Sequence, residues 1–598
     1  MTIKPEDATT DAPAPQASEH TAGLWDGTEI FYRAWLPAAP TDKALILFHR
    51  GHEHSGRFID VVRDLGLTDV AVFAWDQRGH GRSPGERGHA PSFAHIVRDI
   101  DSFVQHVCTR HDKSIENVIV LGHSVGAVAV ATWVHDYAPR IRAMVLATPA
   151  LRVKLYVPLA IPGLRLLQRL KGGRTAFIKS YVKAKMLTHD AEQARAYDED
   201  PLIARAIAVN ILLELFDTSR RLIDDAGAIR TPTLLLAGGA DWVVHVSSQR
   251  RFFDRLGSPL KRIRVFDGMY HDILHEKERH LVLDEARSFV QQAFDASRPD
   301  ENLLEADRRG YTFDEYERLR RPLPVLSPRR VGFAAQRLAM RTLGRLSAGI
   351  RLGWRTGFDS GRTLDYVYEN QPRGQLVLGR LIDRAYVNSP GWRGIRQRRV
   401  HLQQLLRQAI RDAMQQQHDG PIHVLDVATG GGRYVLEVLT EFKPGEVTAT
   451  LRDLQRDNLD ACRALADQLG LRQVAFEQGD AFDAEALANI EPRPHIAVVS
   501  GLYELFPENE PVLRSLRGIA SALQPSGRLI YTGQPWHPQL EMIARVLINR
   551  DGQPWVMRRR TQAELDALVR AAGFEKRGML IDGDGIFTVS LATLRGDA

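Results

Sequence analysis

Short apolar runs recur along the first half of the chain, separated by longer stretches with the spacing of amphipathic helices. The runs, rich in valine, isoleucine and leucine, are 44–48, 70–74, 118–121, 144–147, 233–237 and 263–266. Continuous apolar runs of this length are typical of strands buried on both faces of a parallel sheet. Between residues 151 and 225 the alternation stops, and a helical, partly basic segment replaces it. The pattern predicts an α/β domain with a helical insertion.

A second series of the same kind begins near Pro421. Its runs are 422–426, 447–451, 474–476, 496–499 and 529–531, with a closing pair of strands near Met579 and Ile586. Two α/β series separated by helical residues predict two doubly wound domains in one chain. We therefore expect a leader over 1–22, a first domain over 23–297 with a lid at about 151–225, a basic helical connector that covers the second domain over 298–399, and a second domain over 400–598.

The composition limits the class of protein. The 598 residues carry a net charge of +6, and 44% are hydrophobic, which is ordinary for globular protein. Residues 1–22 are acidic and Ala/Pro-rich, without a basic start and an apolar run, so we expect a disordered leader and not a signal peptide. The sequence contains no run of uncharged apolar residues long enough to predict a membrane span. Cys108 and Cys462 lie in different predicted domains, which fits a reducing cytoplasm.

A serine nucleophile is predicted between a strand and a helix. The segment Gly122-His-Ser-Val-Gly126 follows an apolar run and precedes a run of small residues. A sharp strand-to-helix turn exposes the serine hydroxyl, and the helix N-terminus offers N–H groups to a developing oxyanion. Asp241 and His271 follow later predicted strands, at the edge where open α/β sheets place their sites. The order predicts a catalytic triad in which His271 removes the Ser124 proton and Asp241 orients the imidazole.

Three motifs carry a resemblance to a known family. The segments 49–57, 76–85 and 122–126 resemble the monoacylglycerol lipase and lysophospholipase branch of the α/β-hydrolases, over about residues 23–294. The resemblance implies hydrolysis of lipid-like esters and an oxyanion hole formed by the backbone N–H groups of Gly51 and Val125.

The same loop departs from the family at two positions. Arg50 and His52 stand where glycine is usual, and contact with an anionic head group is one alternative for Arg50. The spacing of His49, His52 and His54 would also suit a metal site, but no carboxylate cluster completes it, so we expect no metal.

Two segments combine apolar residues with bases. Residues 156–164 are apolar and are followed by Arg165, Arg169, Lys171 and Arg174. Residues 328–355 contain arginines at 329, 330, 337, 341, 345, 351 and 355 and no acid. Three of these, at 337, 341 and 345, recur every four residues, so we expect them on one helix face, opposite Phe333 and Met340.

Both segments predict peripheral contact with an anionic membrane, at its inner face if the enzyme is cytoplasmic. The alternatives are a cap helix over the hydrolase pocket and an interdomain helix with solvated arginines. Nucleic acid is disfavoured because no recognition module is present.

The second domain opens with a cofactor loop. Small residues at 424–434 follow a predicted strand, and the arrangement Asp426-x-Ala428-x-Gly430-x-Gly432 resembles class I methyltransferases more than a dinucleotide fingerprint. The resemblance covers about residues 400–595, with alanine at 428 in place of the usual first glycine.

The resemblance implies S-adenosylmethionine as the cofactor. It implies that Asp453 contacts the ribose hydroxyls, that Asp480 with Ala481 lies at the adenine, and that Ser500 lies beside the methyl group. Methyl transfer needs alignment of the acceptor and, for some acceptors, a base. Tyr503, Glu504 and His537 are the candidates, and local capping or pairing is the alternative for Glu504.

The whole chain also resembles bacterial hydrolase–methyltransferase fusions. We therefore predict a bifunctional enzyme that hydrolyses lipid-like esters and methylates a small molecule or a lipid head group, with no obligate protein partner. Two alternatives remain open. One half could be a non-catalytic scaffold, or the methyltransferase could modify RNA with the help of the basic segment.

Overall fold

A computed structural model describes residues 16–171, 175–180, 182–297, 302–416 and 420–596. The chain divides into two compact units, Met1–Asp300 and Glu301–Ala598, each described here by itself. Most of the predicted leader, residues 1–15, lies outside the described residues.

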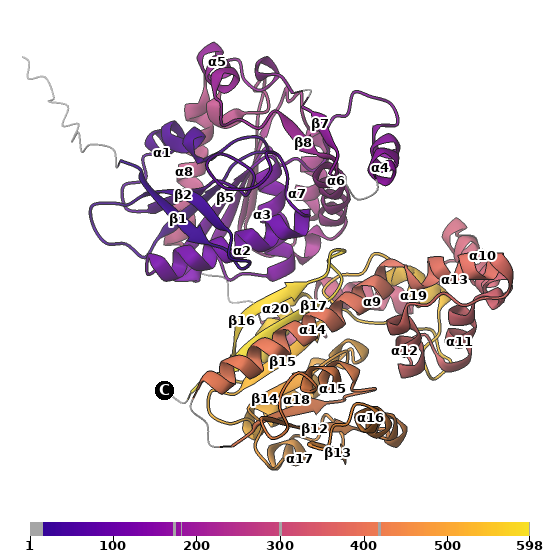
Figure 1. Cartoon of the computed structure of the whole chain (residues 1–598). Coiled ribbons are helices and arrows are strands. Elements are labelled where there is room, and N and C mark those ends of the chain that lie inside the picture. Colours follow the sequence, from indigo (N-terminus) through magenta and orange to yellow (C-terminus); the bar gives the residue numbers. More distant parts are fainter. Residues whose placement is uncertain (1–15, 172–174, 181, 298–301, 417–419, 597–598) are drawn as a thin grey trace, which may run out of the picture. The chain divides into compact units, whose positions relative to one another are not determined.

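The first unit is built on an eight-stranded sheet with the order β1-β2-β4-β3-β5-β6-β9-β10 (Figure 1). The strands are β1 (Ser18–Gly23), β2 (Glu29–Trp35), β3 (Ala44–Phe48), β4 (Ala71–Trp75), β5 (Val118–His123), β6 (Ala143–Ala147), β9 (Thr233–Gly238) and β10 (Lys261–Phe266). From β4 to β10 the neighbours are parallel, as the apolar runs predict.

The leader prediction is wrong for residues 18–22. They belong to β1, which pairs antiparallel with β2 in the register Ser18 to Ala34 through Gly23 to Glu29. The strand gives no apolar run because it lies at the sheet edge, where most of its side chains face water.

Helices cover both faces of this sheet. The helices are α1 (Ile59–Leu65), α2 (Phe93–Arg110), α3 (Val125–Tyr137), α6 (Val209–Asp224), α7 (Val246–Arg255) and α8 (Arg279–Asp295). Apolar residues of α1 and α8 share one core with alternate residues of β3, β4 and β5. The intervening residues Phe48 and Trp75 contact Phe103 of α2 on the opposite face.

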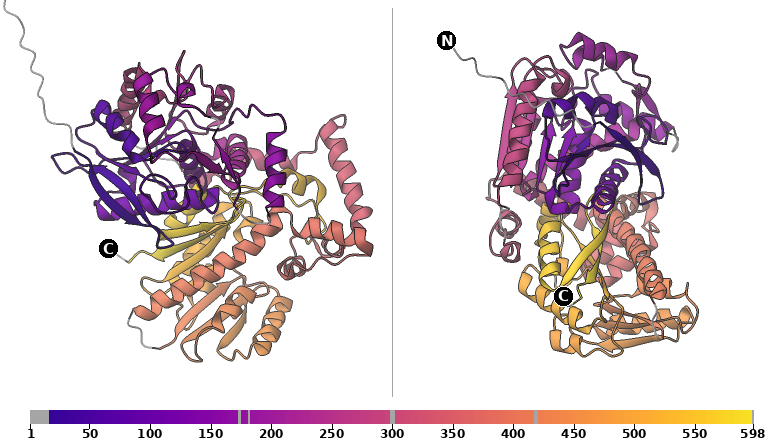
Figure 2. Two further views of the ribbon diagram at one scale, coloured as in Figure 1. Left: turned by 45° about the horizontal axis from the view of Figure 1, so that its top comes forward. Right: turned by 90° about the vertical axis from the view of Figure 1, so that its left-hand side faces the viewer.

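The predicted lid is an excursion between β6 and β9 (Figures 1 and 2). It contains α4 (Ala160–Leu170), α5 (Ala191–Glu199) and α6, and also a small antiparallel sheet of β7 (Phe177–Lys179) and β8 (Ala206–Ala208) that the purely helical prediction missed.

The second unit contains a seven-stranded sheet with the order β13-β12-β11-β14-β15-β17-β16. The strands are β11 (Ile422–Val427), β12 (Val447–Asp453), β13 (Val474–Gln478), β14 (Ile496–Val499), β15 (Arg528–Gly533), β16 (Phe574–Ile581) and β17 (Thr588–Leu594). Two cores sandwich the sheet. One involves α14 (Pro390–Gln415), α15 (Arg433–Leu439) and α16 (Arg456–Gln468), and the other α17 (Ala484–Ala488), α18 (Asn509–Ala522) and α20 (Gln562–Ala571).

The predicted connector and cover, residues 298–399, belongs almost entirely to this unit. The expected boundary at residue 400 falls inside α14, whose Leu402, Leu405 and Leu406 are buried in the core of the sheet. The preceding helices are α9 (Tyr311–Arg320), α10 (Pro328–Arg341), α11 (Ala348–Thr356), α12 (Gly361–Glu369) and α13 (Leu376–Val387). No described helix is both long and apolar enough to cross a bilayer.

One prediction about this segment is wrong. Arg337, Arg341 and Arg345 do not share a helix face, because α10 ends at Arg341 and the chain turns through the 3-10 helix η7 (Leu343–Leu346). Gly344 lets this turn approach α11 closely, since a Cβ at Gly344 would lie 2.9 Å from Cγ2 of Ile350.

Candidate active sites

The predicted nucleophile occupies a strained turn. Ser124 lies between β5 and α3 with φ 54° and ψ −110°, a backbone conformation that side chains rarely adopt. Its neighbours are glycines because the backbone is crowded. A Cβ at Gly122 would lie 2.6 Å from Cα of Ala127, and one at Gly126 would lie 2.4 Å from the carbonyl oxygen of His49. The turn therefore presents Ser124 at the N-terminus of α3.

The three predicted triad residues form one hydrogen-bonded chain. Nε2 of His271 lies 2.8 Å from Oγ of Ser124, and Nδ1 of His271 lies 2.7 Å from Oδ2 of Asp241. The other oxygen of Asp241 accepts the amides of Val243 and Val244 at 2.7 and 2.9 Å. Burial favours the neutral acid, but His271 and the two amides outweigh it and hold the pKa of Asp241 below its usual range.

The loop after β3 lies against the start of α3. A Cβ at Gly51 would sit 3.2 Å from Cγ2 of Val125, so the two residues predicted for the oxyanion hole are neighbours. Val125 is the first residue of α3, where the backbone N–H has no partner within the helix. His52, which replaces the family's glycine, has φ 77° and so adopts the left-handed backbone that glycine takes without strain.

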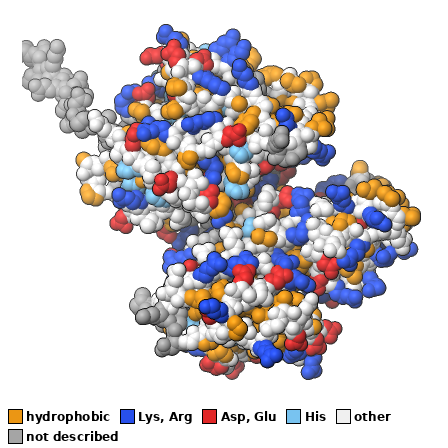
Figure 3. All heavy atoms as spheres, in the orientation of Figure 1, with side chains coloured by type: hydrophobic (Ala, Val, Ile, Leu, Met, Phe, Trp, Pro, Cys, Tyr) orange, Lys and Arg blue, Asp and Glu red, His pale blue; other side chains and the backbone are white. Residues whose placement is uncertain are grey.

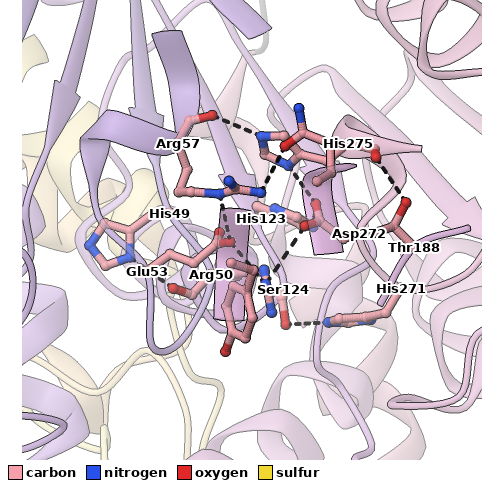
Figure 4. A network of polar contacts seen from close by, with 12 residues as sticks. His49, Arg50, Glu53, Arg57, His123, Ser124, Thr188, His271, Asp272 and His275 are labelled. Carbon is pink, nitrogen blue, oxygen red and sulfur yellow. Dashed lines mark hydrogen bonds and ion pairs between the residues drawn. The ribbon is translucent and has the colours of Figure 1, made fainter. Parts of the chain in front are cut away.

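A buried ionic network adjoins the triad and was not predicted (Figure 4). Nη2 of Arg50 lies 2.9 Å from Oε1 of Glu53 and 3.7 Å from Oδ2 of Asp272, the residue after the triad histidine. Nδ1 of His275 is 2.8 Å from Oδ1 of Asp272. Burial opposes ionisation of Asp272, but His275 and Arg50 together keep its pKa well below the usual range. Two carboxylates thus balance the charge of Arg50, which leaves little of it for an anionic head group.

Two histidines of the predicted loop have separate protein partners. Nδ1 of His49 contacts the carbonyl oxygen of Arg50, and Nε2 of His54 lies 2.9 Å from Oδ2 of Asp200. Within the described part of the chain, no group of three or more His, Cys, Asp or Glu side chains is arranged to hold a metal ion.

A cavity of about 550 Å³ opens in the second unit at the carboxyl ends of β11, β12, β13 and β14. Its lining includes these residues predicted to contact the cofactor: Ala428, Gly430, Gly432, Asp453, Asp480, Ala481 and Ser500. Gly430 faces open space, since a Cβ built on it meets no atom within 4 Å, and its φ of 56° favours glycine. Ala428 holds φ 58°, so the missing glycine leaves local strain of roughly 1–2 kcal/mol.

Asp426 in β11 and Asp453 at the end of β12 have different positions relative to the cavity. Asp453 lines the cavity and accepts the amides of Gly430 at 2.9 Å and Gln455 at 2.8 Å. Asp426 is fully buried, is not among the lining residues, and accepts the hydroxyls of Thr429 and Tyr434 at 2.6 Å each. The prediction of direct cofactor contact is therefore wrong for the Asp426 side chain, which supports the loop. Burial raises its pKa to about 7.

The three residues predicted for the methyl-acceptor side do not all line the cavity. Glu504 and His537 line the cavity, whereas Tyr503 is buried in the core with its hydroxyl 3.0 Å from Oγ of Ser515. The prediction is wrong for Tyr503, because the 3-10 turn Tyr503–Leu505 directs its ring inward. Nδ1 of His537 accepts the amide of Gln539 at 3.0 Å, so the neutral ring carries its proton on Nε2 and is a donor there.

Glu504 has an unpredicted partner. Its Oε1 accepts the Thr532 hydroxyl at 2.9 Å and lies 3.7 Å from Nη1 of Arg398, a buried residue of α14. Its Oε2 and Nε of Arg398 are buried with no hydrogen-bond partner among the described residues. Unsatisfied buried polar atoms beside a cavity indicate the position of a polar ligand group.

Part of the remaining cavity wall is apolar and aromatic. It includes Met340 of α10, Tyr386 of α13, Trp392 of α14, Met542 of α19 (Leu540–Val546), and the loop residues Phe358, Trp555 and Phe587. Sequence reasoning did not identify Tyr386, Met542, Trp555, Phe587 or Arg398, because no local motif joins positions so far apart in the chain.

Comparison with known proteins agrees with this division. A family model described as "Serine aminopeptidase, S33" matches residues 39–278, and one described as "Putative methyltransferase" matches residues 286–594. The chain is 50% identical to "Uncharacterized protein YnbC" of Escherichia coli, over 96% of this chain and 98% of that protein. It is 30% identical to the monoacylglycerol lipase of Mycolicibacterium smegmatis and 31% identical to the human monoglyceride lipase. These two matches cover 46% and 42% of this chain, and 96% and 82% of the lipases.

Proposed function

Because the chain belongs to the methyltransferase family matched over residues 286–594, we propose a bifunctional enzyme. The chain also belongs to the same family as E. coli YnbC. In this chain, an α/β-hydrolase domain precedes the methyltransferase domain. The first unit hydrolyses carboxylic esters of lipid-like alcohols or acids. The second transfers a methyl group from S-adenosylmethionine to a small molecule or lipid head group.

The hydrolase proposal rests on the hydrogen-bonded chain from Asp241 through His271 to Ser124. Nε2 of His271 takes the Ser124 proton as Oγ attacks the ester carbonyl, and the amides of Gly51 and Val125 stabilise the oxyanion. The alcohol leaves with the proton from His271. Water, deprotonated by the same imidazole, then releases the acid from the serine. The likeness to monoacylglycerol lipases favours a lipid-like ester.

The methyltransferase proposal rests on the cavity at the carboxyl ends of β11 to β14. S-adenosylmethionine, when bound, supplies an electrophilic methyl group. Gly430 leaves its backbone open for close approach, and the buried carboxylate of Asp453 is suited to accept ribose hydroxyls. Glu504 takes the proton that the acceptor loses, with Arg398 beside it, while the aromatic wall excludes water and holds the apolar part of the acceptor.

A fluorophosphonate probe tests the first activity. We expect a covalent adduct on Ser124 in the full chain and none in Ser124→Ala with an unchanged circular dichroism spectrum. Absence of labelling in the folded parent chain would instead favour a non-catalytic scaffold.

Calorimetric titration tests the second activity. We expect S-adenosylmethionine to bind the parent chain and to bind Asp453→Asn at least tenfold more weakly. Asp460→Asn, on the exposed side of α16, is the matched control and should bind as the parent does. Equal affinities in all three proteins would contradict the assignment of Asp453.

A further inference from the structure

The second unit exposes a group of large aliphatic side chains around α10, η7 and α13. They are Val325, Leu326, Val331, Leu338, Leu343, Leu376, Val377, Leu378 and Leu381, between 52% and 94% exposed. We call them the α10–α13 surface. Figure 3 shows hydrophobic side chains gathered with basic ones over this part of the unit, at the right-hand edge of the view. Exposed aliphatic side chains that gather in one region indicate an interaction site, whereas single exposed ones scattered over a surface do not.

These residues are not required to close the core. The inner side of the same two helices already packs, since Phe333 and Met340 of α10 and Tyr386 of α13 lie against the cluster around Leu540 and Ile543. Both helices therefore carry apolar residues on two sides, and only the inner side has a partner within the described structure. The outer side is available to something else.

The charge around the surface is predominantly positive. Residues 322–358 contain no aspartate or glutamate. Arg330, Arg345, Arg351, Arg380 and Arg384 are exposed, and among the described residues none of them lies within ion-pair distance of a carboxylate. Arginines elsewhere in this unit commonly do have such a partner, as Arg393 has in Asp584 and Arg407 in Glu441. The unpaired guanidinium groups favour a partner with many negative charges.

The side-chain types identify that partner. Exposed aliphatic side chains insert among the acyl chains of lipids, whereas nucleic-acid binding usually needs exposed aromatic side chains on which nucleobases stack. Guanidinium groups bind the phosphates of anionic lipids. We propose that the α10–α13 surface docks the protein on an anionic lipid bilayer. This docking needs neither catalytic activity. The cavity lies directly behind it, because Met340 and Tyr386 line that cavity from the inner side of the docking helices, so an acceptor with an acyl chain has a short path from the membrane.

Vesicle flotation of the full chain tests the proposal. We expect binding to phosphatidylcholine vesicles containing about a third phosphatidylglycerol, and little binding to phosphatidylcholine alone. The aliphatic variant Leu338→Ser/Leu343→Ser/Val377→Ser and the charge variant Arg345→Gln/Arg380→Gln/Arg384→Gln should each need at least tenfold more lipid for half-maximal binding. Only the charge variant should lose the salt dependence of the parent.

Two controls separate docking from misfolding. Val400→Ser/Met414→Ser removes two exposed apolar residues of the same unit outside the surface and away from the cavity, and should bind vesicles as the parent does. All variants should keep the parent's melting temperature and its affinity for S-adenosylmethionine. Unchanged vesicle binding in the two surface variants would overturn the proposal. So would salt-sensitive RNA binding that the charge variant loses while no chain binds anionic vesicles.

Discussion

The carboxylate of Asp241 shows how a single side chain fixes the chemistry of its neighbour. One oxygen faces His271 and the other is held by two backbone amides. The amides admit only an acceptor, so the orientation of this carboxyl group is determined by the backbone. The proton of the neutral imidazole is thereby kept on Nδ1, and Nε2 is free to accept from Ser124.

Asp241→Asn should therefore abolish most of the esterase activity without unfolding the chain. The amide oxygen of asparagine would take the two backbone N–H groups, and its NH₂ group would face Nδ1 of His271. The imidazole would then carry its proton on Nε2 and could not act as a base. We expect kcat for a chromogenic ester to fall by about 10⁴-fold. Asp267→Asn, at an exposed position after β10, should keep the parent rate. A loss of less than tenfold in Asp241→Asn would contradict this role.

Asp426 makes the stability of the second unit sensitive to pH. Burial raises its folded-state pKa from 3.8 to about 7, so the folded chain holds this proton more tightly than the unfolded chain. Its contribution is therefore favourable at low pH and is lost as the pH rises from about 4 to about 7.

Asp426→Asn should remove this loss. The free energy of unfolding of the variant, minus that of the parent chain, should rise by on the order of 2 kcal/mol from pH 5.5 to pH 8. One unit of pKa shift corresponds to about 1.4 kcal/mol. Urea unfolding at both pH values measures the difference. A relative stability that does not change with pH would show that Asp426 ionises normally.

At the scale of elements, the crossing of β3, β5 and α3 in the first unit requires small residues. A Cβ at Gly126, in the first turn of α3, would lie 2.4 Å from the carbonyl oxygen of His49 and 2.6 Å from that of Phe48, where β3 ends. Neither carbonyl group can move away from α3 without displacing the loop that carries Gly51. The element that presents the nucleophile and the loop predicted for the oxyanion hole are thus fixed to each other by backbone contact.

Gly126→Ala should consequently destabilise the first unit by roughly 1–3 kcal/mol and reduce esterase turnover. Gly163→Ala in α4 is a matched control, because a Cβ there meets no atom within 4 Å. It should be neutral or stabilise slightly through helix propensity. Thermal unfolding and ester turnover of the two variants give the comparison. Equal stability would mean that the backbone at Gly126 is less crowded than described.

At the scale of the whole molecule, the two units have separate cores. The core around α1 and α8 draws its residues from 17–294, and the cores of the second sheet from 402–594. The methyltransferase match begins at residue 286, yet Ala286, Phe289 and Val290 of α8 pack in the first core. The family boundary and the structural boundary therefore differ by about one helix.

Separate cores predict ligand responses that are also separate. In calorimetry of the full chain, S-adenosylhomocysteine at a hundredfold excess over its Kd should raise one transition by about 5 °C and leave the other unchanged. A phosphonate adduct on Ser124 should shift only the other transition, that of the hydrolase unit. Asp453→Asn should lose the shift caused by S-adenosylhomocysteine and keep the shift caused by the phosphonate. A single transition that responds to both ligands would show that the units unfold together.

The amino-acid sequence by itself determined the two α/β series, the strands of both large sheets other than the edge pair β1–β2, and the order of the triad residues, but not the separate two-stranded sheet of β7 and β8. It could do so because apolar runs and small residues at tight turns are local requirements of buried strands and strand-to-helix crossings. Only the tertiary structure decided which polar groups outside the triad meet. Arg398 reaches Glu504 across about a hundred residues of chain, Tyr503 turns into the core beside it, and Arg50 pairs with Asp272 next to the triad. These outcomes depend on contacts between distant segments, which no spacing along the chain encodes.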